Sequence, residues 1–266
     1  MNIGLLCEQE KDFQRYLEFI RTRSYLSDTE LLTNLSAVYK KIYMITSLAS
    51  SIVKISPRSD IGNFYYECKN NLILSFDLCN TNYSNASKQI LRSGIESFFR
   101  LSLALQHYIE YRDNKSKGIF YATPLLKKLK SMQQIHSVGR VTNFVVNFYK
   151  DEPVGDIFKE LNDKYSQLSG SVHVNKKENF TPQKYLSDYA HIDINKSSDY
   201  LNIFENIINS IIIILYYFSF LLIKEEVYFS RKDITEFSQT LVTTTHLEGI
   251  ESKLEQLNDT SSSNLI

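Results

Sequence analysis

Residues 84–111 read SNASKQILRSGIESFFRLSLALQHYIEY, and this stretch predicts a long α-helix. Its apolar side chains recur three, four and seven residues apart, the spacing that places them on one broad helix face: Ile90, Leu91, Ile95, Phe98, Phe99 and Leu105. Ser84 and Asn85 are residue types that begin helices, because their side chains accept hydrogen bonds from the first free N–H groups. We therefore expect one helix from residue 84 to about residue 111.

Both flanks of this stretch repeat the helical spacing. Eight glycines and four prolines in 266 residues are too few for the frequent turns of a sandwich or a barrel. The further helices that we expect lie at about 12–23, 28–56, 60–78, 137–150, 156–172, 197–229 and 233–257. Two more begin at Thr123 and Pro124, with Met132 still within the helix, and at Thr181 and Pro182, because proline suits the first turn of a helix. Val141, Val145 and Val146 leave a strand open as the alternative for 137–150.

The predicted fold class is therefore all-α. An N-terminal helical part at 1–58 precedes an up-and-down bundle at 59–229. An acidic amphipathic helix at 230–258 and a disordered tail at 259–266 follow it.

The cysteines and the chain's start indicate a reducing compartment. Cys68 and Cys79 lie eleven residues apart, about 16 Å along one helix, which is too far for a disulfide or a shared metal. We expect these two and Cys7 to be buried or half-buried thiols. Residues 1–10 lack the basic start and the long apolar run of a signal peptide, so we expect a cytoplasmic protein.

A membrane location competes with a core helix at residues 207–223. This run, IINSIIIILYYFSFLLI, has 17 residues and no charge, the lower limit for crossing a bilayer. A helix that is buried on all sides in a bundle has the same composition. We expect the core helix, with membrane association as the alternative.

Arg92, Glu96 and Arg100 form a charged stripe on the 84–111 helix. Their spacing of four places them on one face, a turn apart, where Glu96 can bridge both arginines. An ordinary surface ladder of ion pairs gives the same pattern. The apolar neighbours indicate that the stripe is half-buried, where charges are costly unless they are paired and used, so a functional use stays open beside the structural one.

His107 and a second cluster supply acid–base candidates. His107 follows Arg100 by seven residues and faces the same way, about 10 Å further along the helix. An arginine can hold a phosphodiester while an imidazole moves a proton near neutral pH. Tyr165, Ser169 and His173 are again four apart, on one face if the helix continues through Gly170. The structural alternatives are a solvated helix end for His107 and a hydrogen-bonded helix end for the second cluster.

Two segments together resemble HEPN-like domains. They are LRSGIESFFR at 91–100 and the pattern Tyr165-x-x-Leu168-Ser169-x-x-Val172-His173, which is similar to bacterial members that read "LRS-x-x-E" and then "Y-x-x-L-S-x-x-V-H". The similarity covers roughly residues 60–225. It implies a bundle of four or five helices that often dimerises. Active members are metal-independent ribonucleases with an Arg-x4–6-His motif, and many are toxins or abortive-infection proteins.

This chain departs from that pattern in where its histidine falls. The Arg-x4–6-His motif of active members lies on a later helix and often has a polar residue after the arginine. Here the in-range pair is Arg100 and His107, on the helix of Arg92, and Leu101 follows Arg100. Two readings stay open: His173 is the working histidine, brought to Arg92 or Arg100, or it is structural in an inactive member.

Local charge indicates where a nucleic acid could bind. The whole chain has 30 basic and 30 acidic residues, so its net charge attracts no polyanion. Residues 114–150 contain no acidic residue, and aromatic residues that can stack on bases lie among the basic ones. The RNA-binding candidates are Lys115, Lys117, Lys127, Lys128, Lys130 and Arg140. A solvated basic face over an aromatic core is the alternative.

The sequence thus predicts an RNA-directed toxin or anti-phage defence effector, a metal-independent endoribonuclease. The predicted catalytic residues are Arg92, Glu96, Arg100, His107, Tyr165, Ser169 and His173. The alternative is a catalytically inactive helical binding module, such as an antitoxin or a sensor subunit. The expected partners are RNA and either a second copy or a defence protein. No histidine pair has the spacing of metal ligands, so we expect neither a metal nor a cofactor.

Overall fold

The computed structural model describes three long stretches of the chain, residues 29–47, 59–172 and 194–223. It also describes the isolated residues Lys11, Gln14, Glu18, Ile52, Lys54, Ile55, Lys184, Asp188, Tyr189 and Ser252. The predicted helices at 12–23, after Thr181 and at 233–257, the tail, Cys7 and His173 lie outside this described part.

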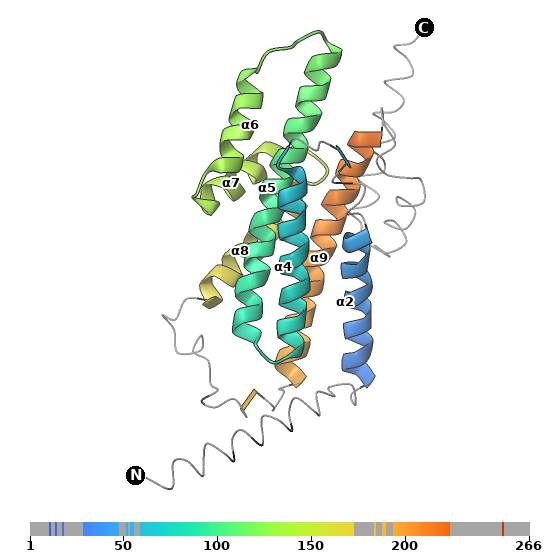
Figure 1. The fold of residues 1–266 in the computed structure, drawn as a ribbon, viewed down its shortest axis with the longest axis vertical. Coiled ribbons are helices and arrows are strands. Elements are labelled where there is room, and N and C mark those ends of the chain that lie inside the picture. The colour runs from blue at the N-terminus through green and yellow to red at the C-terminus, as the bar shows by residue number, and fades with distance from the viewer. Residues whose placement is uncertain are drawn as a thin grey trace.

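The described residues form helices and contain no strand, which confirms the all-α prediction (Figure 1). The helices are α2 (Thr29–Ser47), α4 (Ile61–Asn80), α5 (Ser84–Ser116), α6 (Pro124–Gln134), α7 (Val138–Tyr149), α8 (Gly155–Val172) and α9 (Ile194–Ile223). The strand alternative for 137–150 is wrong, because α7 buries Val141, Val145 and Tyr149 at helical spacing.

Helices α4 and α5 form a tight antiparallel pair. A left-handed residue, Asn82 at φ 63°, ends α4, and the N–H of Tyr83 donates to the carbonyl of Leu78 at 2.9 Å. This arrangement satisfies carbonyls that the helix end leaves free. Further along, the Cα of Gly94 on α5 comes so close to α4 that an added Cβ would lie 3.4 Å from the Cβ of Asn71. Gly94 thus marks a close approach of α5 to α4, where an added methyl group would just touch Asn71.

A buried hydroxyl cluster joins this pair to α9. The Tyr200 hydroxyl lies 2.7 Å from the Ser75 hydroxyl and accepts from the Ser87 hydroxyl at 2.6 Å. All three side chains are buried, and each serine hydroxyl also lies within hydrogen-bond distance of the carbonyl of the other serine, at 2.9 and 2.5 Å. The cluster therefore sets the register of α4, α5 and α9.

Helix α9 lies within the packed helices. Its residues 211–219 are all buried, and α2 joins it through an ion pair of 2.6 Å between Lys41 and Glu205. Within the described chain, Ser197–Ser219 is the one stretch apolar and long enough to cross a membrane, with mean hydropathy 1.5. Its burial supports the interpretation of 207–223 as a core helix. The core also continues across residue 58 from α2, so α2 packs as part of the bundle.

Helices α6, α7 and α8 cover the other side of α5. Thr123 caps α6 as its sequence predicts, accepting from the N–H of Leu126 at 3.3 Å. Phe158 of α8 packs on Phe99 of α5 with ring centroids 5.9 Å apart, and also stacks on Tyr149 of α7. Helix α6 lies along the C-terminal half of α5, and α8 lies along its N-terminal half (Figure 1).

Candidate functional site

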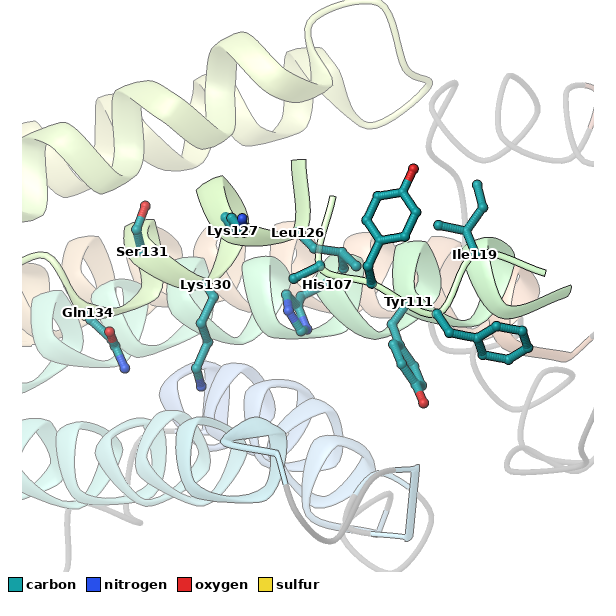
Figure 2. A pocket seen from close by; sticks show the side chains of 11 residues that line it. His107, Tyr111, Ile119, Leu126, Lys127, Lys130, Ser131 and Gln134 are labelled. Atoms are coloured by element: carbon teal, nitrogen blue, oxygen red, sulfur yellow. The ribbon is translucent and has the colours of Figure 1, made fainter. Parts of the chain in front are cut away.

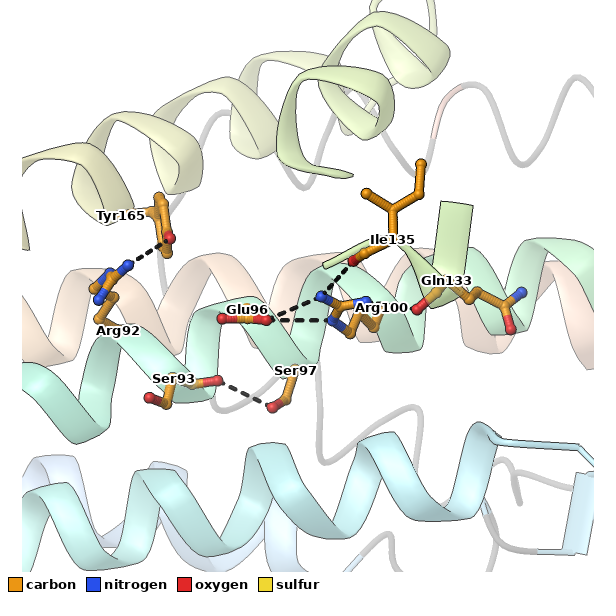
Figure 3. Close-up of polar contacts among 8 residues, drawn as sticks. All are labelled: Arg92, Ser93, Glu96, Ser97, Arg100, Gln133, Ile135 and Tyr165. Carbon is orange, nitrogen blue, oxygen red and sulfur yellow. Dashed lines mark hydrogen bonds and ion pairs between the residues drawn. The ribbon is translucent and has the colours of Figure 1, made fainter. Parts of the chain in front are cut away.

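The charged stripe of α5 lies under α6 and α8, where Figure 3 shows its polar contacts. Arg92, Glu96 and Arg100 follow each other at single turns, and all three are half-buried. The apolar neighbours Ile95, Phe98 and Phe99 are fully buried. The prediction of a half-buried stripe is therefore confirmed, and the partners of each residue decide what it can do.

Arg92 contacts helix α8. Its Nη2 donates a hydrogen bond of 3.1 Å to the Tyr165 hydroxyl, and its guanidinium carbon lies 5.2 Å from the centre of that ring. Its Nε is buried and has no hydrogen-bond partner among the described residues. The buried Nε is closed to a ligand, so the donors that an anionic ligand could accept from are those of the two Nη groups that the bond to Tyr165 does not use.

Arg100, in contrast, holds the end of helix α6. Its Nη1 donates to the carbonyl of Gln133 at 2.5 Å, and its Nη2 donates to the carbonyl of Ile135 at 2.9 Å. Its Nη2 also pairs with Glu96 at 3.0 Å, and the Arg100 side chain is only 14% exposed. The last carbonyls of a helix lack partners within it, and a cation satisfies them well. The geometry thus gives Arg100 a structural task at its predicted site position.

Glu96 pairs with one arginine of the stripe. The sequence allowed it to bridge both, but it accepts hydrogen bonds from Arg100, at 3.0 Å and 3.4 Å, while Arg92 turns to Tyr165. Glu96 therefore orients the guanidinium that caps α6.

Helix α8 runs antiparallel to α5. Phe158 meets Phe99 and Tyr165 meets Arg92, so later residues of α8 lie further toward the start of α5. Between the two arginines, Arg92 is therefore the nearer to the end of α8. The Ser169 hydroxyl donates to the Tyr165 carbonyl at 2.8 Å, and α8 continues through Gly170 to Val172. His173 follows in the sequence and lies outside the described residues.

His107 lies in a separate place. It follows Arg92 by fifteen residues, about 22 Å along the helix axis, and lines a groove between α5 and α6 (Figure 2). Partial burial and the nearby Lys130 ammonium lower the pKa of His107 below its ordinary value of 6.5. The structure therefore divides the predicted catalytic residues between two sites, one at Arg92 and one at His107.

The predicted RNA-binding residues also divide. Lys127 and Lys130 line the His107 groove, and Lys130 makes an ion pair of 2.7 Å with Asp60. Lys128 turns the other way, toward the ring of Phe144 on α7 at 5.7 Å. The remaining three are exposed, Lys115 and Lys117 around the end of α5 and Arg140 on α7.

Two groups that contact these site residues could not be predicted from the sequence. The carbonyls of Gln133 and Ile135 bind Arg100 through their backbone, which any residue type supplies. Asp60 precedes α4 and pairs with Lys130 across seventy residues, a contact that no local pattern encodes. Among the described residues, no three His, Cys, Asp or Glu side chains gather where they could hold a metal.

Comparison of this chain with protein families, with curated proteins and with solved structures found no match. The fold and the sites define an all-helical bundle protein with a half-buried arginine between α5 and α8 and a basic groove between α5 and α6.

Proposed function

We propose that this chain is a HEPN-type protein that cleaves RNA without a metal ion, as a cytoplasmic toxin or anti-phage defence effector of the abortive-infection kind. One observation carries the proposal: Arg92 and Tyr165, from the two segments that resemble HEPN-like domains, meet at 3.1 Å across α5 and α8. The meeting supports a shared site, because residues 73 positions apart bring a guanidinium with free donors to the helix that leads to His173.

The reaction follows from the chemistry of these groups. The 2′-hydroxyl of RNA attacks the adjacent phosphorus, and the bond from phosphorus to the 5′-oxygen breaks, leaving a 2′,3′-cyclic phosphate and a 5′-hydroxyl. His173 accepts the proton of the 2′-hydroxyl, and solvent water gives a proton to the leaving 5′-oxygen. Arg92 binds the phosphate and stabilises its added negative charge, and Tyr165 holds the guanidinium in place. Glu96 and Arg100 position α6 rather than the substrate.

Incubation of end-labelled single-stranded RNA with the purified chain in EDTA tests the proposal. We expect cleavage by the unchanged chain and its loss in Arg92→Ala and His173→Ala. The control Lys40→Ala, which changes an exposed side chain of α2, should keep full activity. Growth arrest on expression, lost in the same two variants, is the matching result in cells. Cleavage that EDTA abolishes, or that Arg92→Ala retains, contradicts the proposal.

A second candidate function is a binding module that does not cleave. It is supported by the use of Arg100 in capping α6 and by the distance of about 22 Å that separates Arg92 from His107 along the helix. Arg100 is thus engaged with α6, and Arg92 lies far from His107, so neither arginine shares one phosphate with His107. Intact RNA at high protein concentration, together with measurable RNA binding, selects this function over cleavage. In both cases we propose a homodimer or a complex with a defence partner, which light scattering of the purified chain measures.

A further inference from the structure

The groove between α5 and α6 has the lining of a ligand site. Its volume is about 480 Å³, which lies within the range of roughly 300–1,000 Å³ usual for small-molecule pockets. Its walls come from the C-terminal half of α5, from the connection at 117–123 and from α6 (Figure 2). The side chains that the argument uses are His107, Tyr111, Phe120, Tyr121, Lys127 and Gln134, and none of the lining residues is acidic.

Three aromatic side chains that line this groove are exposed to solvent. Phe120 is 80% exposed, Tyr121 is 70% exposed and Tyr111 is 50% exposed. Rings of this size normally bury most of their surface, and a cluster of exposed ones marks a surface that binds something. The groove thus presents stacking surfaces that the fold itself does not cover within the described chain.

The connection that carries Phe120 and Tyr121 is held at both ends. Gly118 takes a positive φ of 76°, and the N–H of Ile119 donates to the carbonyl of Asn114 at 2.8 Å. Thr123 then caps α6 through the N–H of Leu126. Fixed ends lower the entropy that ordering these rings around a ligand would require.

The charge beside the rings is positive and open. Lys127 is exposed on the groove, and Lys115 and Lys117 are exposed near the end of α5. Lys130 makes an ion pair with Asp60, whereas Lys127 makes none among the described residues, so Lys127 is the lining lysine with the freer charge for a phosphate.

We propose that this groove binds unpaired bases of single-stranded RNA, with bases stacked on Phe120 and Tyr121 and a phosphate paired with Lys127. Exposed aromatic rings interleaved with lysines are the features that bind single strands without reading sequence. His107 and Gln134 can hydrogen-bond to a base edge at the groove floor. Because burial and Lys130 keep His107 neutral at pH 7, its ring offers one donor and one acceptor.

The inference rests on the proposed function in taking RNA as the ligand, and it places binding away from Arg92. At roughly 3.4 Å per stacked nucleotide, the 22 Å between positions 92 and 107 equals about six nucleotides. The groove would therefore bind the RNA strand several nucleotides away from the phosphate that Arg92 would bind.

Fluorescence anisotropy with the full chain and a labelled 2′-O-methyl RNA of about 12 nucleotides tests the inference, within the usual footprint of single-strand sites. This probe lacks the attacking hydroxyl, so binding is measured whether or not the chain cleaves RNA. We expect Phe120→Ala and Tyr121→Ala each to weaken binding about 5-fold or more, the effect of losing one stacked base. Lys127→Ala should weaken binding and reduce the slope of log affinity against log salt by about one.

The control variants make the same kinds of substitution on helix α2, away from the groove. Tyr43→Ala removes an α2 tyrosine that is 65% exposed, and Lys40→Ala removes an exposed α2 lysine, so both should bind as the unchanged chain does. Duplex RNA and a free mononucleotide should bind much more weakly than the single strand. Equal binding of the aromatic variants, or a mononucleotide that competes as well as the oligomer, overturns the inference. If the unchanged chain does not cleave RNA but Tyr121→Ala still weakens RNA binding, the proposed enzyme is refuted and the proposal that the groove binds RNA stands.

Discussion

Replacing Arg100 should destabilise the protein strongly. In Arg100→Met the apolar stem of the side chain is kept and only the guanidinium is removed. The carbonyls of Gln133 and Ile135 then lose their charged donor in a site where the side chain is 14% exposed. Each hydrogen bond to a charged group contributes roughly 1.5–3 kcal/mol, so the two together predict a loss of about 3–6 kcal/mol in the free energy of unfolding. The ion pair with half-exposed Glu96 adds little.

Urea unfolding followed by circular dichroism measures this loss. Arg92→Met is the matched comparison, because Arg92 makes one hydrogen bond to Tyr165 and one ring contact, which together are worth about 1–2 kcal/mol. Arg100→Lys should recover less than half, since a single ammonium cannot reach both carbonyls as a guanidinium fork does. If Arg100→Met unfolds within about 1 kcal/mol of the unchanged chain, Arg100 does not hold α6 and is free for another role.

Three further predictions follow from the same structure. Tyr200→Phe removes the hydroxyl shared by buried Ser75 and Ser87, which keep their carbonyl partners, and should lower the free energy of unfolding by about 0.5–1.5 kcal/mol in urea titrations. Gly155→Ala places a Cβ 2.5 Å from a backbone oxygen of α7 and should lower the melting temperature, at a cost of about 1–3 kcal/mol. The pKa of His107 is lower in the folded chain than in the unfolded one, so stability should fall as pH drops through 6.5, and His107→Gln should flatten that slope in unfolding curves recorded from pH 5 to 8.

The helices could be predicted where local chemistry decides them. Thr123 followed by Pro124 marks the start of α6, and the structure has the cap bond that this pair implies. Helix α5 extends to Ser116 instead of Tyr111, and beyond Tyr111 the Arg112 Nη2 donates to the carbonyl of Leu221 on α9 at 3.0 Å. It begins at Ser84 with Tyr83 in the cap position, so the predicted cap residues lie one and two positions inside it. Contacts between helices, which a local pattern does not encode, set these ends.

The candidate site could be predicted as a helix face but not as a set of partners. A spacing of four places Arg92, Glu96 and Arg100 in line, and the structure has them so. The same spacing cannot tell which arginine meets a tyrosine hydroxyl and which meets backbone carbonyls. That difference arises because α8 covers one half of α5 and α6 covers the other. The separation of His107 from Arg92, in contrast, follows from the sequence alone, because fifteen residues of one helix span about 22 Å.

The identity of the RNA ends after cleavage in EDTA tests the central claim most directly. We predict 2′,3′-cyclic phosphate and 5′-hydroxyl ends from the unchanged chain and from Lys40→Ala, and no cleavage by Arg92→Ala that retains its circular dichroism spectrum. Products that carry 5′-phosphates, or equal cleavage by Arg92→Ala, would contradict the account, because the guanidinium beside Tyr165 would then hold no reacting phosphate.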